Sequence, residues 1–200
     1  MTKIKSIRLL VVFLLVCTIG NAQIPNSAED ISPLLIGEKI PEATLLDDNG
    51  KSINLNEEIA KQKTVLVFYR GGWCPYCNMQ LASLAATEKD ILDLGYQIIA
   101  VSPDNYKNLK PSVEKNKTGY KLYADSDGSF IKNLGIGFTP NERTSNYIAK
   151  KTIGKTTEVL PVPTVLVLNK KGEILFEYIS PNYKQRISPE LLLAVLENVK

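Results

Sequence analysis

Residues 64–81 read TVLVFYRGGWCPYCNMQL and combine an apolar run, a glycine pair and two cysteines. The run from Thr64 to Tyr69 is apolar, β-branched and aromatic, which is typical of a strand buried on both faces. A helical pattern follows the glycines and starts near Cys74. Two thiols three positions apart at such a place can bind a metal, anchor a haem, form a structural disulfide or act as a redox pair.

The composition narrows these choices. The 200 residues contain no histidine, which excludes Ser-His-Asp hydrolases, Cys-His proteases, haem ligation through imidazole and nearly all catalytic zinc sites. Haem attachment would also require histidine at position 78, which is Asn78. Zinc needs four ligands, and the two thiols supply only half of them. We therefore expect no metal and no cofactor.

Residues 1–22 have the pattern of a cleaved secretory signal. A basic start is followed by the apolar run LLVVFLLVCTI at residues 9–19 and by small residues at Gly20 and Ala22. The run is shorter than the ~20 residues that a membrane-spanning helix needs. We expect cleavage after Ala22 and export to the periplasm or the exterior, without stable membrane insertion afterwards. A lipoprotein acylated at Cys17 is the alternative, although Val16 before it is bulkier than such sites prefer.

Export changes the charge and the cysteine count. Three of the 24 Lys and Arg residues lie in the signal, which leaves 21 cations against 21 Asp and Glu. A neutral mature chain gives no indication of a nucleic-acid partner or of an anionic membrane surface. Only Cys74 and Cys77 remain, and in an oxidising compartment such a pair forms a disulfide unless something reduces it.

The rest of the chain predicts one α/β domain at residues 37–200, preceded by a loosely held arm at residues 23–36. The expected elements are a hairpin (43–46 and 51–55), a strand (64–69), a long helical stretch ending at Gly95, a strand (97–101), a surface helix (103–117), a strand (121–124), a short helix (129–134), an insertion without assigned structure (136–158), a strand pair (164–168 and 173–178) and a final helix opened by Ser188 and Pro189. Parallel strands joined by crossover helices, with an antiparallel hairpin at the end, predict an α/β/α sandwich with a mixed central sheet and an N-terminal β-hairpin extension.

The position of the cysteines favours redox chemistry over a structural role. Unpaired N–H groups and the positive end of the helix dipole at a helix N-terminus stabilise a thiolate on Cys74. Pro75 suits the first helical turn, and Cys77 lies one turn further on the same face. A disulfide that closes so short a loop removes little chain entropy and is a poor structural link. The pattern predicts Cys74 as the nucleophile and Cys77 as the resolving cysteine.

Neighbouring residues each have a structural and a functional interpretation. Gly71 and Gly72 can form a tight turn or let a substrate approach, and Trp73 can pack in the core or shield the site. We expect Arg70 to end the strand in solvent, with added positive potential at the thiolate as the alternative. Tyr76, between the cysteines, is expected to tune their exposure.

Proline at position 163 stands directly before a central-type strand, where it cannot donate to the ladder and must mark a bend. A cis Val162–Pro163 bond would supply such a bend, whereas a trans bond is the more frequent state of any proline.

These motifs together resemble the thioredoxin superfamily. Trp73-Cys74-Pro75-Tyr76-Cys77 at a strand-to-helix turn and Pro163-Thr164 before a late hairpin carry that resemblance. Ile40 to Leu55, Val101 to Asp104 and Tyr123 to Gly128 are more specifically similar to the alkyl hydroperoxide reductase/thiol-specific antioxidant (AhpC/TSA) family, and FYRGGWCPYCNMQL to its peroxiredoxin-like branch. The resemblance implies that Pro163 is a cis-proline facing the disulfide, that Val162 and Thr164 flank a substrate site, and that Cys74 matches both the thioredoxin nucleophile and the peroxidatic cysteine.

The chain departs from these patterns at three points. Peroxiredoxins carry Pro seven residues and Thr or Ser three residues before the peroxidatic cysteine, where this chain has Val67 and Gly71. Thioredoxins carry a buried acid six residues before the first cysteine, where this chain has Phe68. The active-site arginine of peroxiredoxins has three candidates in the mature chain, namely Arg70, Arg143 and Arg186.

Three functions remain open on these grounds. The leading hypothesis is an exported thiol-disulfide oxidoreductase in redox homeostasis, acting on a thiol or disulfide protein and recharged by an external thiol donor. The alternatives are a thiol-dependent peroxidase that reduces hydroperoxides through a Cys74 sulfenic acid, and a non-catalytic binding module on a thioredoxin scaffold.

Overall fold

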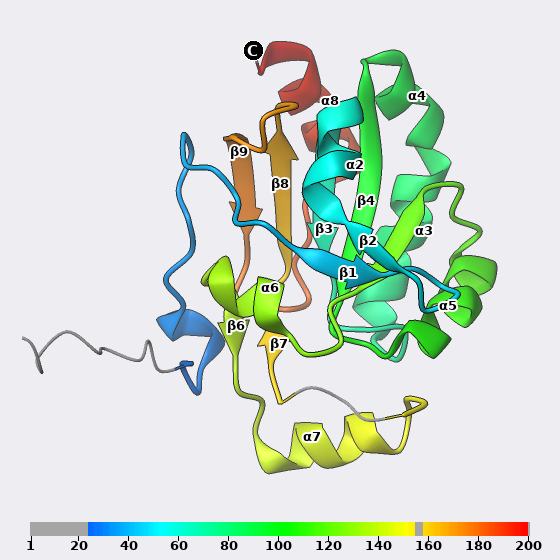
Figure 1. Cartoon of the computed structure of the whole chain (residues 1–200), viewed down its shortest axis with the longest axis vertical. Helices are drawn as coiled ribbons and strands as arrows, with labels where there is room; N and C mark the ends of the chain where they lie inside the picture. The colour runs from blue at the N-terminus through cyan, green and yellow to red at the C-terminus, as the bar shows by residue number, and fades with distance from the viewer. Residues whose placement is uncertain (1–23, 155–157, 200) are drawn as a thin grey trace, which may run out of the picture.

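The structure is a computed structural model that describes residues 24–154 and 158–199. The predicted signal at residues 1–22, with Cys17, lies outside the described residues. A seven-stranded sheet in the order β2-β1-β5-β4-β3-β8-β9 forms the centre of the molecule (Figure 1). Its strands are β1 (Thr44–Leu46), β2 (Ser52–Asn54), β3 (Lys63–Phe68), β4 (Tyr96–Ser102), β5 (Lys121–Ala124), β8 (Thr164–Leu168) and β9 (Ile174–Ile179).

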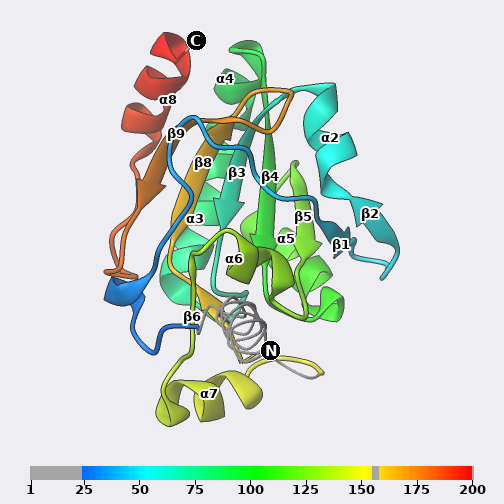
Figure 2. The same ribbon diagram turned by 60° about the vertical axis from the view of Figure 1, so that its left-hand side comes forward.

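Helices cover both faces of this sheet (Figures 1 and 2). One apolar cluster packs α3 (Pro75–Ala86), α4 (Glu88–Asp93), α5 (Leu109–Asn116) and α8 (Pro189–Asn198) against the sheet. The other joins α2 (Leu55–Lys61) and α6 (Ser129–Asn133) to the opposite face. The predicted α/β/α sandwich is therefore confirmed.

The sheet is mixed, as expected. Strand β3 pairs in parallel with β4, Phe68 lying beside Val101, and antiparallel with β8, where Phe68 lies beside Thr164. The N-terminal hairpin β1–β2 joins the sheet through β1 and β5. Because β3 is central and apolar on both faces, Val65 to Phe68 are fully buried, which holds the end of β3 rigidly before the cysteines.

Three segments differ from the sequence-based expectation. The long helical stretch is two helices, because Thr87 leaves helical geometry and its hydroxyl donates back to Ser83 O. The insertion contains β6 (Gly137–Phe138), α7 (Glu142–Ala149) and β7 (Leu160–Pro161). The surface-helix segment consists of a 3₁₀ turn, η2 (Tyr106–Asn108), and α5.

The N-terminal arm is fastened to the domain rather than loosely held. It contains one 3₁₀ turn, η1 (Ala28–Asp30), and its backbone bonds to the segment after α6, Ser32 N–H to Gly135 O and Leu34 N–H to Leu134 O. Pro25 O also accepts a bond from Thr139 N–H, after β6.

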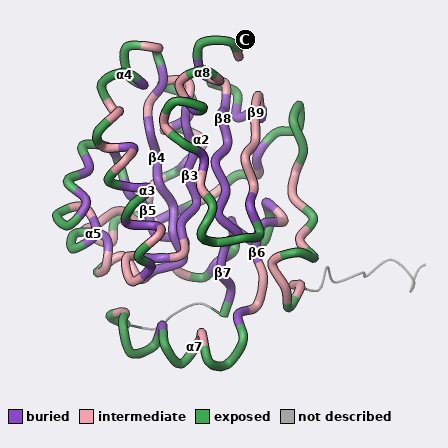
Figure 3. The backbone as a smooth tube through the Cα atoms, turned by 180° about the vertical axis from the view of Figure 1, so that it is seen from behind, coloured by how far each residue is buried: buried purple, intermediate pink, exposed green. Residues whose placement is uncertain are grey.

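Helix α7 stands apart from both helix layers, beyond the carboxyl ends of β3 and β4, and most of its residues are exposed (Figures 1 and 3). Since the cysteines also follow the carboxyl end of β3, α7 lies at the same end of the molecule as the cysteines. Within residues 24–154 and 158–199, none of the helices is both long and apolar enough to cross a membrane.

Candidate active site

Cys74 is the N-cap residue of α3, at the place that the sequence predicts. It has extended backbone geometry, Pro75 occupies the first turn, and the backbone N–H of Cys77 donates to Cys74 Sγ over 3.4 Å. A helix N-terminus supplies unpaired N–H groups and positive potential, so this position favours the thiolate of Cys74.

The two cysteines form a disulfide, and their Cα atoms lie 5.3 Å apart. Both residues are almost inaccessible, since Cys74 is 1% exposed and Cys77 is fully buried. A partner that reacts with Cys74 must therefore reach the bottom of a recess rather than a protruding sulfur.

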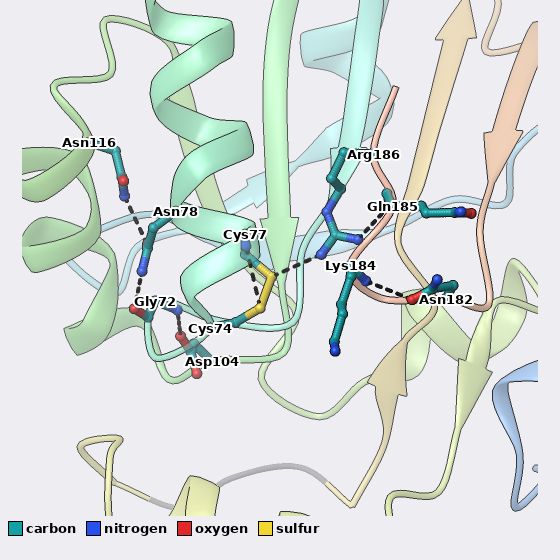
Figure 4. The surroundings of a disulfide bond; sticks show 10 residues. All are labelled: Gly72, Cys74, Cys77, Asn78, Asp104, Asn116, Asn182, Lys184, Gln185 and Arg186. Atoms are coloured by element: carbon teal, nitrogen blue, oxygen red, sulfur yellow. Dashed lines mark hydrogen bonds between the residues drawn. A yellow bond between two sulfur atoms is a disulfide. The ribbon is translucent and has the colours of Figure 1, made fainter. Parts of the chain in front are cut away.

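Hydrogen bonds from three elements fix the turn before Cys74 (Figure 4). Asn78, on α3, donates through Nδ2 to Gly72 O over 2.9 Å, and Asn116, on α5, donates to Asn78 Oδ1 over 3.1 Å. From the loop after β4, Asp104 accepts the N–H of Gly72 over 2.8 Å. The turn is thus held on both its N–H and its carbonyl side, which orients Cys74 without contact to its sulfur.

Sequence reasoning did not assign Asp104 a role of its own, although it lay in a family-like motif. Asp104 is 3% exposed. Burial raises the pKa of its carboxyl to about 6, although the hydrogen bond from the Gly72 N–H acts in the opposite direction and lowers it. A polar loop residue after a strand carries no local signal of burial, because its burial depends on α5 and on the turn.

Glycine is required at positions 71 and 72 for packing. Gly71 has a φ of +138°, and a Cβ there would collide with Trp73 Nε1 and lie 2.8 Å from Asp104 Oδ1. A Cβ on Gly72 would collide with Ser112 Oγ. Both glycines therefore form a tight turn, and position 71 cannot present the hydroxyl that peroxiredoxins carry there.

A groove of about 400 Å³ leads to Cys74. Its walls are largely aromatic and cationic, formed by Arg70, Trp73, Pro75, Tyr76, Arg143, Thr144, Tyr147 and Tyr183. Helix α7 supplies one wall, so the insertion that had no assigned structure borders the candidate site. Trp73 and Tyr147 meet edge to face with ring centroids 5.9 Å apart.

Arg70 does not end the strand in solvent. Its guanidinium carbon lies 5.0 Å from the ring centroid of Trp73 and 4.6 Å from that of Tyr183, so the two rings enclose it. Burial lowers its pKa, yet an arginine stays charged at neutral pH. The structure thus supports the alternative interpretation, in which Arg70 adds positive potential near the groove.

Arg186 reaches the cysteines from the loop between β9 and α8. Its Nη2 donates to Cys77 Sγ over 3.5 Å (Figure 4). Arg143, the third candidate, lies on α7 at the rim of the groove. The arginine in contact with a sulfur is therefore beside the predicted resolving cysteine and not beside Cys74.

The predicted substrate-binding residues Val162, Pro163 and Thr164 are all buried. The Val162–Pro163 bond is trans, because the described residues contain no cis peptide bond, so the cis-proline prediction is wrong. Val162 N–H donates to Ile136 O, in the segment leading into β6, and Val162 O accepts from Thr164 Oγ1. These bonds use the N–H of Val162 and one of the two lone pairs of its carbonyl oxygen.

No group of three or more His, Cys, Asp or Glu side chains that could hold a metal ion lies together in the described ranges 24–154 and 158–199. Of the two disulfide-bonded cysteines, Cys74 lines the groove, and Cys77 is buried behind it.

Comparison with known proteins gives a consistent result. The family model of the AhpC/TSA family matches residues 36–176. The peroxiredoxin bcp1 of Schizosaccharomyces pombe is 31% identical over 126 residues, which cover 62% of this chain and 65% of that protein. The peroxiredoxin Bcp of Bacillus subtilis is 24% identical over 156 residues, which cover 78% of this chain and 92% of its own length.

Among solved structures, the reduced Prx3 of Vibrio vulnificus in complex with H₂O₂ superposes with a TM-score of 0.70 and 21% identity. The match covers 82% of this chain and 99% of that one, which shows a shared fold.

Proposed function

Because the chain belongs to the AhpC/TSA family and is therefore an oxidoreductase, we propose that it is a thiol-dependent peroxidase in which Cys74 attacks the peroxide and Cys77 resolves. The observation that carries this proposal is the recessed position of Cys74, which is 1% exposed beneath an aromatic groove of about 400 Å³. A hydroperoxide is small enough to enter such a groove. A protein disulfide would have to bring its own backbone past the groove walls. The names of the relatives support the same activity.

The proposed cycle uses only the two sulfurs and an external thiol. The Cys74 thiolate attacks the terminal oxygen of ROOH, the O–O bond breaks, and the alcohol leaves after taking a proton. The Cys77 thiolate then attacks Sγ of the Cys74 sulfenic acid, and hydroxide leaves as water. Two external thiols reduce the disulfide and become a disulfide themselves. Overall, ROOH and two thiols give ROH, water and one disulfide.

The chain supports the first step without a hydroxyl at position 71. The N-terminus of α3 stabilises the thiolate, and Arg70 adds positive potential at the groove. Gly71 has no side-chain hydroxyl to polarise the O–O bond. The rate of the first step should therefore depend more strongly on stabilisation of the Cys74 thiolate.

The second candidate is the thiol-disulfide oxidoreductase. It is favoured by the Trp73-Cys74-Pro75-Tyr76-Cys77 sequence and by the missing hydroxyl and proline at positions 71 and 67. In this case a protein substrate would have to reach the sulfur of Cys74 past the walls of the groove.

Stopped-flow mixing of the reduced mature chain with hydrogen peroxide or tert-butyl hydroperoxide separates the two functions. Trp73 is the single tryptophan and adjoins Cys74, so its fluorescence is a direct probe. We expect oxidation at least about a hundredfold faster than that of a free thiol at the same pH. Cys74→Ser should abolish this phase, whereas Cys77→Ser should keep it and stop at the sulfenic acid. A rate equal to that of a free thiol, together with fast insulin reduction, would replace the peroxidase by the second candidate.

Export remains a separate proposal that rests on the sequence of residues 1–22. N-terminal sequencing of the protein recovered from the producing cells tests it. Cleavage before Gln23 is the expected result, whereas a lipid-modified Cys17 at the new N-terminus would support the lipoprotein alternative.

A further inference from the structure

The loop that follows β9 brings one cation to the less accessible cysteine. Arg186 lies 109 positions from Cys77 in sequence, yet its Nη2 contacts Cys77 Sγ at 3.5 Å (Figure 4). Nη1 donates to Gln185 O over 3.0 Å, which anchors the other side of the guanidinium. The Nε of Arg186 is buried without a hydrogen-bond partner. The guanidinium thus points at the disulfide from a position that is not part of the groove wall.

This cation has no carboxylate partner in the part of the chain that the structure describes. The ion pairs there are Lys61–Glu58, Lys89–Asp93 and Lys121–Glu58, all away from the site. The charged or titratable groups that act on Arg186 are Arg70 and Tyr178. Burial, followed by repulsion from Arg70, lowers the pKa of Arg186 to about 10, so it remains charged at neutral pH. Next to the neutral disulfide, this half-buried cation therefore has no anion to balance its charge.

Reduction of the disulfide creates the missing anion. Cys74 as N-cap has the helix N-terminus and the Cys77 N–H to stabilise its charge, whereas Cys77 lies inside the first turn and is fully buried. Burial alone would favour the neutral thiol of Cys77, which reacts poorly. Another positive group is therefore needed at this sulfur, and the guanidinium of Arg186 is in contact with it.

We propose that Arg186 is a catalytic residue of the resolving half of the cycle, holding Cys77 as a thiolate through direct contact with its sulfur. This inference rests on the proposed function, in which Cys77 resolves the oxidised Cys74. When Cys77 attacks Cys74 Sγ, Arg186 keeps the attacking sulfur deprotonated until the S–S bond forms and hydroxide leaves. When an external thiolate attacks Cys74 Sγ, the S–S bond breaks and its electron pair goes to Cys77, whose negative charge Arg186 again stabilises.

The decisive measurement is the thiol pKa of Cys77 in a Cys74→Ser chain, from the rate of alkylation against pH. We expect a value below the ~8.5 of a free thiol despite complete burial. Arg186→Gln in the same background should raise the pKa of Cys77 by about one unit or more. At a pH below the Cys77 pKa of either chain, the thiolate fraction of the variant is then about tenfold smaller. Arg186→Lys should restore part of the shift, and Lys184→Gln, which removes a neighbouring exposed charge, should leave it unchanged.

Two results would overturn the proposal. One is a Cys77 pKa at or above 8.5 in the Cys74→Ser chain with Arg186 intact, a result that needs no arginine variant to fold. The other is a Cys77 pKa that Arg186→Gln does not change, in a chain whose circular dichroism shows native structure. Neither readout involves a peroxide, so failure of the peroxidase proposal would appear separately, as a slow first step in the Cys77→Ser chain.

Discussion

Asp104 accepts the backbone N–H of Gly72 over 2.8 Å, a contact that joins the loop after β4 to the turn before Cys74 across 32 positions. It makes the orientation of the cysteine helix depend on a buried carboxyl in the loop that follows β4. Together with the Asn78 and Asn116 bonds, it explains how a turn containing two glycines can be held in one conformation.

The Asp104 carboxyl should make stability depend on pH. Burial raises its folded pKa to about 6, above the ordinary value of 3.8, so the folded chain holds its proton more tightly than the unfolded chain. Stability contributed by the protonated form is present below about 4 and is lost as the pH rises to about 6. Asp104→Asn keeps an acceptor for the Gly72 N–H and should remove this loss. The difference in unfolding free energy between the variant and the unmodified chain should therefore be up to roughly 3 kcal/mol more favourable to the variant at pH 7 than at pH 4. Urea unfolding of both proteins at pH 4 and pH 7 measures the effect. The prediction is contradicted if the free energy of unfolding changes by the same amount between the two pH values in Asp104→Asn and in the unmodified chain.

Gly71→Ala should destabilise the chain through both its backbone and its surroundings. A positive φ costs a side chain roughly 1 kcal/mol, and the Cβ would also collide with Trp73 Nε1. Gly95→Ala is a matched control, because Gly95 has a φ of +86° with open space around its Cβ position. We expect the loss of unfolding free energy at Gly71 to exceed that at Gly95 by at least about 1 kcal/mol. Urea unfolding measures both values. Equal losses of unfolding free energy in Gly71→Ala and Gly95→Ala would mean that the contacts around Gly71 do not destabilise the variant.

Asn78→Ala should loosen the cysteine turn. The substitution leaves Gly72 O without its side-chain donor and should cost about 1–3 kcal/mol of stability. Asn116→Ala removes the bonds of Asn116 Nδ2 to Asn78 Oδ1 and to Ser112 O, neither of which is made to the turn itself, and should loosen the turn less. Denaturant unfolding gives both values, and hydrogen exchange at the first turn of α3 should accelerate in Asn78→Ala alone. The opposite order of the two costs would place the main support of the turn on α5.

Arg70→Gln should slow the reaction of Cys74 with hydroperoxide about tenfold. The guanidinium lies between Trp73 and Tyr183, where it is partly shielded from water, so its charge is less screened than a surface charge. Lys170→Gln, in the exposed turn between β8 and β9, removes one charge at a distance and serves as the control for net charge. The stopped-flow rate measures the effect. Equal rates for Arg70→Gln and the unmodified chain would assign Arg70 to packing only.

Much of this protein could be predicted from short stretches of its sequence. Thr64 to Tyr69 identified the central strand because a run of apolar β-branched residues can be buried on both faces only inside a sheet. Ser188 and Pro189 predicted the start of α8, and Ser188 Oγ does accept the N–H of Leu191. The helix start at Cys74 followed from the same local rules. In each case the deciding interactions lie within a few residues.

Other features were decided by tertiary structure alone. The sequence left the role of Arg70 open, and the rings of Trp73 and Tyr183, one of them more than a hundred positions away, enclose it. The segment that contains α7 had no assigned structure in the sequence, and its two ends are held together by the pairing of β6 with β7.

The reason is the range of the forces involved. Strand and helix patterns record which face of a segment is apolar, so the sequence by itself determined the strands of the central sheet, their order along the chain and the helix start at Cys74. The contact of Arg186 with Cys77 and that of Asp104 with Gly72 join segments 109 and 32 positions apart. Such contacts arise only when the sheet brings its loops together, and burial there changes the pKa of a charged group that a sequence shows as an ordinary surface residue.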